Sequence, residues 1–213
     1  MEIEMKMVLP DKSVAERIWE DPYLSKIEEQ GTREAVYMEA AYFDTEEGDL
    51  GRSDITFRVR KEGPKVIATL KWNGKAPVGG LHIREEINVP VDDPICFIQP
   101  DPELFRESEA GQQLLKVLNG KEVHSILEIH FLRTRERVDN GTSICEISVD
   151  TGEILTDYGT APICEMEIEL FSGDPEDVKK MGSYLANTYG LVPEDRSKYA
   201  RGLALIQKNQ SQN

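Results

Sequence analysis

The chain has 213 residues, of which 39% are hydrophobic and 31% are charged, so it has enough apolar side chains for a folded core. Its length is about 1.4 times a typical domain of roughly 150 residues, which favours one domain over two. The 25 basic and 40 acidic residues give a net charge of −15, which repels phosphate backbones and anionic lipids, so we expect neither nucleic-acid polymers nor membranes as partners.

The sequence contains no apolar run of about 18 residues and no basic segment followed by an apolar one at its start. We therefore expect no membrane span and no signal peptide, and we expect a cytoplasmic protein. The three cysteines, Cys96, Cys145 and Cys164, do not have the spacing of a zinc site, so they are predicted to be reduced packing residues.

Alternation of polar and apolar residues recurs along the chain and predicts a mainly β protein. The predicted strands cover residues 2–9, 36–43, 54–61, 65–72, 81–91, 130–138, 143–150 and 162–171. Asn140-Gly141 predicts a hairpin turn, because both residues tolerate a positive φ.

Three helices are predicted between the strands. The first begins at a capping box formed by Ser13 and Glu16, and the second covers residues 101–118. The third covers residues 175–189, with Asp174 as its N-cap and Gly190 just past its end. We predict a single domain over residues 1–205 and a frayed C-terminal tail over residues 206–213.

Charged residues in the predicted strands alternate with apolar ones and are sorted by sign. The basic faces carry Arg58 and Arg60, Lys71, and Arg133 and Arg135. The acidic faces carry Glu2 and Glu4 next to Lys6, then Asp150, and then Glu165, Glu167 and Glu169. The last three carboxylates would lie within about 14 Å on one strand face, where they repel one another unless a cation lies against them.

Taken one strand at a time, each charged row is explained by a solvated outer face of a sheet. Solvated faces gain nothing from sorting acids and bases onto different strands, whereas a site for a metal-bound polyanion needs both kinds of group. The joint pattern therefore favours a closed or nearly closed barrel with charged faces inside and helices packed on its apolar outside.

At this point the sequence resembles the CYTH family of triphosphate tunnel metalloenzymes, whose opening signature Glu-x-Glu-x-Lys is matched by Glu2, Glu4 and Lys6. The resemblance continues through Tyr42-Phe43-Asp44-Thr45, Phe57-Arg58-Val59-Arg60, Leu70-Lys71-Trp72, Arg84-Glu85-Glu86-Ile87-Asn88, Arg133-Thr134-Arg135, Ile147-Ser148-Val149-Asp150, Cys164 to Leu170, and Ser197-Lys198-Tyr199-Ala200-Arg201-Gly202. It covers essentially the whole chain. Residues 144–202 look most like the CYTH part of bacterial inorganic triphosphatases.

The resemblance implies an α+β fold: an eight-stranded antiparallel barrel, the triphosphate tunnel, with helices packed outside. It also implies a small-molecule triphosphate substrate and Mg²⁺ or Mn²⁺ as cofactor. The residues expected to bind phosphate oxygens are Lys6, Arg58, Arg60, Lys71, Arg84, Arg133, Arg135 and Lys198. The expected metal ligands are Glu2, Glu4, Asp150, Glu165, Glu167 and Glu169.

Within this set, Lys6, Glu4 and Glu167 are the expected catalytic residues, and no side-chain nucleophile is needed because phosphoryl transfer depends mainly on positioning and electrostatics. Glu86 is expected to face inward with Arg84 as a supporting residue, because the neighbouring Glu85 has the opposite parity. Lys198 is included on the resemblance alone. Glu146 and Arg137 have the right parity but are expected at a solvated tunnel mouth, so they are left out of the site.

The leading hypothesis is metal-dependent hydrolysis of inorganic triphosphate to pyrophosphate and phosphate. Three alternatives stay open: a thiamine triphosphatase, a class IV adenylate cyclase on the same fold, and a non-catalytic module that binds polyphosphate or a nucleotide. The sequence does not locate residues that would hold an organic group. A homodimer formed through an apolar outer face also stays open.

Overall fold

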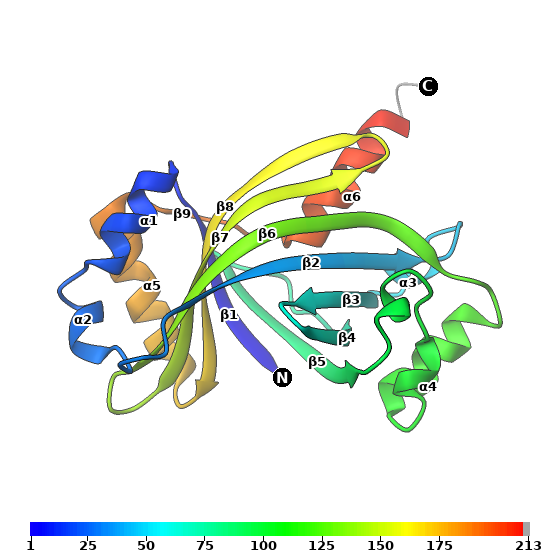
Figure 1. The fold of residues 1–213 in the computed structure, drawn as a ribbon, viewed down its shortest axis with the longest axis horizontal. Helices are drawn as coiled ribbons and strands as arrows, with labels where there is room; N and C mark the ends of the chain where they lie inside the picture. Colours follow the sequence, from blue (N-terminus) through cyan, green and yellow to red (C-terminus); the bar gives the residue numbers. More distant parts are fainter. Residues whose placement is uncertain (211–213) are drawn as a thin grey trace.

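The computed structural model describes residues 1–210, and its main feature is a closed antiparallel β-barrel (Figure 1). The eight long strands are β1 (Glu2–Val8), β2 (Glu34–Asp44), β3 (Thr56–Glu62), β4 (Lys65–Trp72), β5 (Leu81–Val91), β6 (His124–Asp139), β7 (Ile144–Thr156) and β8 (Gly159–Ser172). They follow the order β5-β4-β3-β2-β6-β7-β8-β1, and pairing of β1 with β5 closes the barrel. The two-residue strand β9 (Val192–Pro193) pairs with the end of β1. The predicted fold class is confirmed.

The apolar outer faces of the strands are covered by two groups of helices, on opposite sides of the barrel in Figure 1. One group packs on β1, β7 and β8 and consists of α1 (Lys12–Trp19), α2 (Leu24–Ile27) and α5 (Pro175–Tyr189). The other packs on β2, β3 and β4 and consists of α3 (Asp49–Arg52), the 3-10 helices η1 (Pro94–Phe97) and η2 (Pro102–Phe105), and α4 (Glu109–Leu118). With its apolar outside covered, the barrel can keep charged side chains inside.

Two of the three helix predictions were wrong in detail. Helix α1 is capped by Asp11 rather than by Ser13, because the Asp11 carboxylate accepts a hydrogen bond of 2.8 Å from the Ser13 backbone N–H. Residues 101–118 do not form one helix: the chain makes the 3-10 helix η2 and starts again at Ser108, whose hydroxyl caps α4. Helix α5 has the predicted bounds and caps.

Strands β6, β7 and β8 extend well beyond the predicted ranges 130–138, 143–150 and 162–171. Their extensions turn apolar side chains toward the inside of the barrel, among them Leu127, Ile129 and Ile154. This part of the inner face lacks the charged alternation from which the strands were predicted, which explains the error.

Helix α6 (Lys198–Gln210) covers these apolar extensions and lies beside β7 and β8 in Figure 1. Tyr199 and Ile206 pack against the apolar cluster, and a Cβ atom at Gly202 would come within 2.6 Å of the Leu127 side chain. Residues 206–210 of the predicted frayed tail are therefore helical, held by the contact of Ile206. Residues 211–213 lie outside the described residues.

The three cysteines form no disulfide among the described residues; Cys145 is buried in the cluster under α1 and α5, and Cys164 packs against that cluster. Within residues 1–210, no helix is long and apolar enough to cross a membrane.

Replacing Ile168 by Ala tests the packing between the barrel and helices α1 and α5. Ile168 is fully buried in that cluster, so we expect the free energy of unfolding to fall by about 2–5 kcal/mol. Urea denaturation followed by circular dichroism measures the change. The matched control is Val192→Ala, at a side chain that is 60% exposed, where a change within about 0.5 kcal/mol is expected. Equal midpoints for the two variants would contradict this packing.

Candidate active site

The inside of the barrel holds a charged cavity of about 260 Å³ with two opposed walls. One wall is acidic and carries the inward side chains of β1 and β8, including Glu2, Glu4, Glu167 and Glu169. The other is basic and carries the guanidinium groups of β3 and β6. Strand β2 separates these basic strands and contributes only Ala40 and Tyr42 to the lining, and the small Ala40 leaves room for the arginines on both sides.

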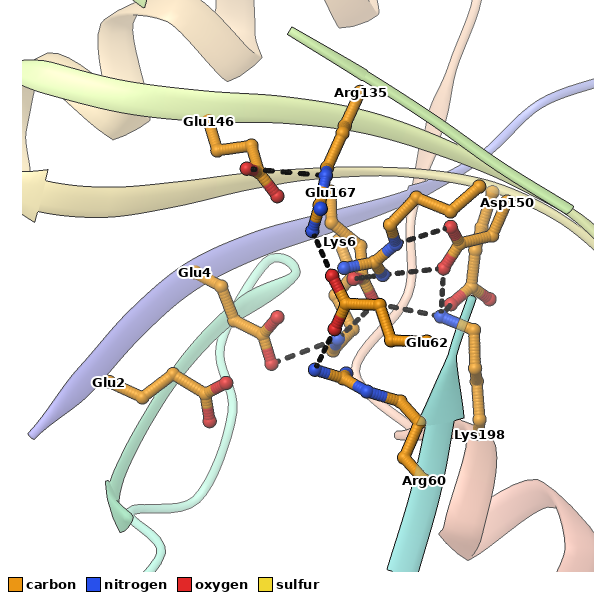
Figure 2. Close-up of polar contacts among 12 residues, drawn as sticks. Glu2, Glu4, Lys6, Arg60, Glu62, Arg135, Glu146, Asp150, Glu167 and Lys198 are labelled. Atoms are coloured by element: carbon orange, nitrogen blue, oxygen red, sulfur yellow. Dashed lines mark hydrogen bonds and ion pairs between the residues drawn. The ribbon is translucent and has the colours of Figure 1, made fainter. Parts of the chain in front are cut away.

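Lys6 lies at the centre of the acidic wall. Its ammonium donates a hydrogen bond to Glu167 and lies 2.9 Å from Glu4 Oε1 (Figure 2). Burial alone would lower the pKa of Lys6, but the negative charges of Glu167 and Glu4 outweigh burial and raise this pKa well above its ordinary value. Lys6 therefore keeps its positive charge at every physiological pH.

At the inner end of the cavity, Asp150, Glu165 and Glu167 form a buried acidic cluster whose ligand oxygens all lie within 4.8 Å of one another. The Lys198 ammonium lies among them, 2.7 Å from Asp150 Oδ2 and 2.9 Å from Glu167 Oε1, and it also pairs with Glu165. Arg133 binds both oxygens of Asp150 at 2.7 Å. Carboxylates spaced in this way fit a divalent cation.

Burial alone would raise the pKa of Glu167, but the charges of Lys198, Lys6 and Arg133 lower it well below the ordinary value of 4.5. Glu167 is thus an ionised group in contact with cations from three different elements: β1, β6 and α6.

The outer part of the acidic wall holds more negative charge than its cations balance. Lys71 pairs with Glu2, at 2.6 Å, and with Glu86. Glu169 is the direct cross-strand neighbour of Glu4 and forms no ion pair with any described residue. Burial, together with the charges of Glu2 and Glu4, raises the pKa of Glu169 to about 7. A carboxylate this hard to ionise marks a place where an added cation would be stabilised.

On the basic wall, crowding of positive charge acts on Arg60. Burial alone would lower the pKa of Arg58, but Tyr42, Glu86 and Glu2 raise it. The Arg58 guanidinium donates to Thr69 Oγ1 at 3.1 Å but has no ion pair among the described residues. Burial and the neighbouring charges of Arg58 and Arg133 lower the pKa of Arg60 to about 10. The Nε atoms of Arg58, Arg60 and Arg84 are buried without a hydrogen-bond partner in the described chain. Unpaired donors on crowded cations favour an anion between these side chains.

The structure places all but two of the predicted site residues in the lining of this cavity. The lining includes Glu2, Glu4, Lys6, Arg58, Arg60, Lys71, Arg84, Glu86, Arg133, Arg135, Glu167, Glu169 and Lys198. Asp150 and Glu165 are not in the lining and contact Lys198 instead. Glu86 faces the cavity, whereas Glu85 pairs with the N-terminal amine, as their parity predicted.

Three charged residues near the cavity were not included in the predicted site. Glu146 lines the outer end of the cavity, but its side chain is only 17% exposed and not solvated as expected. Arg137 is exposed, as expected, and pairs with Glu29. Glu62 is buried at the end of β3 and shares the inward parity of Arg60, which could have revealed it. Arg201 pairs with Glu165 at 2.6 Å from α6, a helix that the sequence reasoning did not predict.

A closed antiparallel barrel with opposed acidic and basic walls defines a triphosphate tunnel fold. Residues 1–203 match the CYTH domain, and the chain belongs to the CYTH family. It is 28% identical to the inorganic triphosphatase of Haemophilus influenzae over 97% of this chain and 55% of that protein. The chain thus spans about half the length of this curated relative.

Solved structures share the fold over nearly the whole chain. One is HpAC1 from Hippeastrum, described as a proposed adenylyl cyclase with a dominant triphosphatase activity (TM-score 0.71, 22% identity, 96% of both chains covered). Another is PH1819 from Pyrococcus horikoshii (TM-score 0.59, 18% identity, 98% of this chain and 99% of that chain covered).

Replacing Glu169 by Gln tests the excess negative charge of the acidic wall. The raised pKa means that wild type loses stability as the pH rises from about 4.5 to about 7, because the folded state must give up a proton that it holds more tightly than the unfolded state. In metal-free buffer we expect Glu169→Gln to be more stable than wild type by roughly 1–3 kcal/mol above pH 7 and to match it below pH 4.5.

Thermal melts between pH 4 and pH 8 measure this difference, with Glu153→Gln on the outer surface as the control. Added Mg²⁺ should stabilise wild type more than Glu169→Gln. A difference that does not change with pH would contradict the charge imbalance.

Proposed function

We propose that this protein hydrolyses inorganic triphosphate to pyrophosphate and phosphate with Mg²⁺ or Mn²⁺ as cofactor. The observation that carries the proposal is the pair of opposed walls: the Arg58 guanidinium, which forms no ion pair with any described residue, lines a cavity whose other side holds the carboxylates of β1 and β8. A linear polyanion bound between the walls would contact basic groups on one side and metal-type oxygens on the other.

The size of the cavity supports an inorganic substrate over a nucleotide. Its volume of about 260 Å³ is below the range of about 300–1,000 Å³ usual for sites that enclose an organic molecule. A phosphate chain needs no aromatic or apolar pocket, and the lining is mostly charged. The similarity to a bacterial inorganic triphosphatase also supports an inorganic substrate.

The acidic wall has the chemistry to hold a hard divalent cation, because all its ligand atoms are carboxylate oxygens. Glu2, Glu4 and Glu169 are the first candidates, since the raised pKa of Glu169 reports uncompensated negative charge there. Asp150, Glu165 and Glu167 are spaced for a cation but contact the Lys198 ammonium, so they would take one only if Lys198 moved onto a phosphate. A cation bound at this wall would withdraw charge from the phosphate oxygens.

The protein's own residues would do the rest by positioning and electrostatics, the main sources of catalysis in phosphoryl transfer. Arg58 would hold phosphate oxygens by planar, bidentate contacts, and Arg60 and Arg133 would contribute the donors that Glu62, Asp150 and Glu167 leave free. Lys6, fixed between Glu4 and Glu167, would stabilise the negative charge that grows on the bridging oxygen as its bond to phosphorus breaks. Water supplies the oxygen of the new phosphate group. The charges of Lys71 and Arg58 lower the pKa of Glu86 to about 2 despite its burial, so Glu86 would stay ionised and hold Lys71.

Phosphate release from inorganic triphosphate, thiamine triphosphate and ATP, with Mg²⁺ or Mn²⁺, tests the proposal. Wild type should prefer inorganic triphosphate, and Glu4→Gln and Arg58→Gln should each lower kcat by about 10²–10³. Arg137→Gln is the matched control, because Arg137 lies on β6 but pairs with Glu29 outside the cavity, and it should stay within about twofold.

Absence of turnover on inorganic triphosphate with either metal would sink the proposal. Formation of cyclic AMP from ATP would then favour a cyclase, and tight binding without turnover would favour a binding module.

A further inference from the structure

A buried carboxylate lies beside the basic wall, just outside the lining of the cavity. Glu62 closes the inward row of β3 after Arg58 and Arg60 and is 8% exposed. Its Oε1 lies 2.7 Å from Arg135 Nη1, and its Oε2 lies 3.2 Å from Arg60 Nη2 (Figure 2). One carboxylate therefore occupies donors of two arginines that line the cavity, one on β3 and one on β6.

The sheet geometry explains why a single side chain reaches both arginines. Strand β2 lies between β3 and β6, and its Met38 pairs with Glu62 on one side and with Phe131 on the other. Glu62 extends across β2 to Arg135 on β6, while Arg60 is its same-face neighbour two residues earlier, about 6.8 Å along the strand. Burial would raise the pKa of Glu62, but the charges of Arg60 and Arg135 lower it below the ordinary value, so Glu62 is ionised at neutral pH.

The two ends of the cavity differ in what limits them. At the inner end, Lys198 and Tyr199 enter the cavity from α6, and apolar side chains fill the barrel beyond them. At the outer end, the lining continues to Arg135, Glu146 and the 48% exposed Phe171. On β3, Arg58 has no carboxylate partner in the described chain, whereas the next inward arginine, Arg60, is paired with Glu62. The stretch of basic groups available to an anion is thus limited at the inner end by α6 and at the outer end by the pairing of Arg60 with Glu62.

We propose that Glu62 is the residue that limits the length of the phosphate chain the tunnel accepts. It withdraws donors of Arg60 and Arg135 from a fourth phosphate unit and places a negative charge behind these arginines, so that inorganic triphosphate is bound and longer chains are rejected. This inference rests on the proposed function, since it names the feature that selects the substrate of the same site.

A purely structural role for Glu62 makes a different prediction. If Glu62 only held Arg60 and Arg135 in place, its replacement would lower activity on every substrate by the same factor. A chain-length limit instead changes the ratio of activities between substrates of different length, because only the longer chain brings like charges together.

The test compares kcat/KM for linear inorganic tetraphosphate and inorganic triphosphate, with Mg²⁺, in wild type and Glu62→Gln. Glu62→Gln should raise the ratio of tetraphosphate to triphosphate activity by at least about tenfold. The matched control is Glu34→Gln, because Glu34 also pairs with Arg135, at 2.6 Å, but its side chain is 52% exposed. Its ratio should stay within about twofold of wild type, and an unchanged ratio in Glu62→Gln would overturn the inference.

Two further measurements keep the result interpretable. If Glu62→Gln does not fold, Glu62→Asp is used instead, because its shorter side chain moves the carboxylate away from the arginines. It should raise the same ratio, and an unchanged ratio there also overturns the inference.

Calorimetric titration of both phosphate chains separates this inference from the proposed function. Wild type that binds triphosphate without hydrolysing it would refute the proposed hydrolysis, and the ratio of the two Kd values would then decide the chain-length limit. Wild type that binds neither chain would refute both.

Discussion

The structure depends on the pairing of buried charges of opposite sign inside a closed barrel. An isolated ion buried in this way would be strongly destabilising, and the barrel avoids this by bringing strands with acidic and basic inner faces into contact. Glu167 alone touches cations from β1, β6 and α6. Glu169 and Arg58 lie on opposite walls and form no ion pair with any described residue, and these two places are where a cation and an anion would complete the network.

Most of the site prediction rested on the alternation of strand residues between the two faces of the sheet. In a strand, alternate residues share a face whatever the tertiary structure, so the rows of Arg58 and Arg60 and of Glu165, Glu167 and Glu169 could be assigned to one side each from the sequence. Whether that side faced solvent or the inside could not be decided from any one strand. The sorting of charges between strands supported the inside, and the barrel has that arrangement.

The features that were missed have a common physical origin. The inner extensions of β6, β7 and β8 and the helix α6 pack apolar groups against each other, and apolar runs do not distinguish an inner from an outer face. Lys198 reaches the cavity, and Arg201 reaches Glu165, only because α6 docks there, so their roles depend on tertiary contacts. Glu62 was missed for another reason: it lies one residue past the end of the predicted strand, although it has the right parity.

The closing strand of the barrel also links the site to folding. Strand β1 carries Glu2, Glu4 and Lys6, and it pairs with β5 on one side and with β8 on the other. The contact of Lys6 with Glu167 joins residues 161 positions apart in the chain, and contacts of such long range form slowly because a large loop must close first. The charged interior is therefore assembled only when both ends of the sequence have been joined, so a nascent chain has no functional site until β8 has been synthesised.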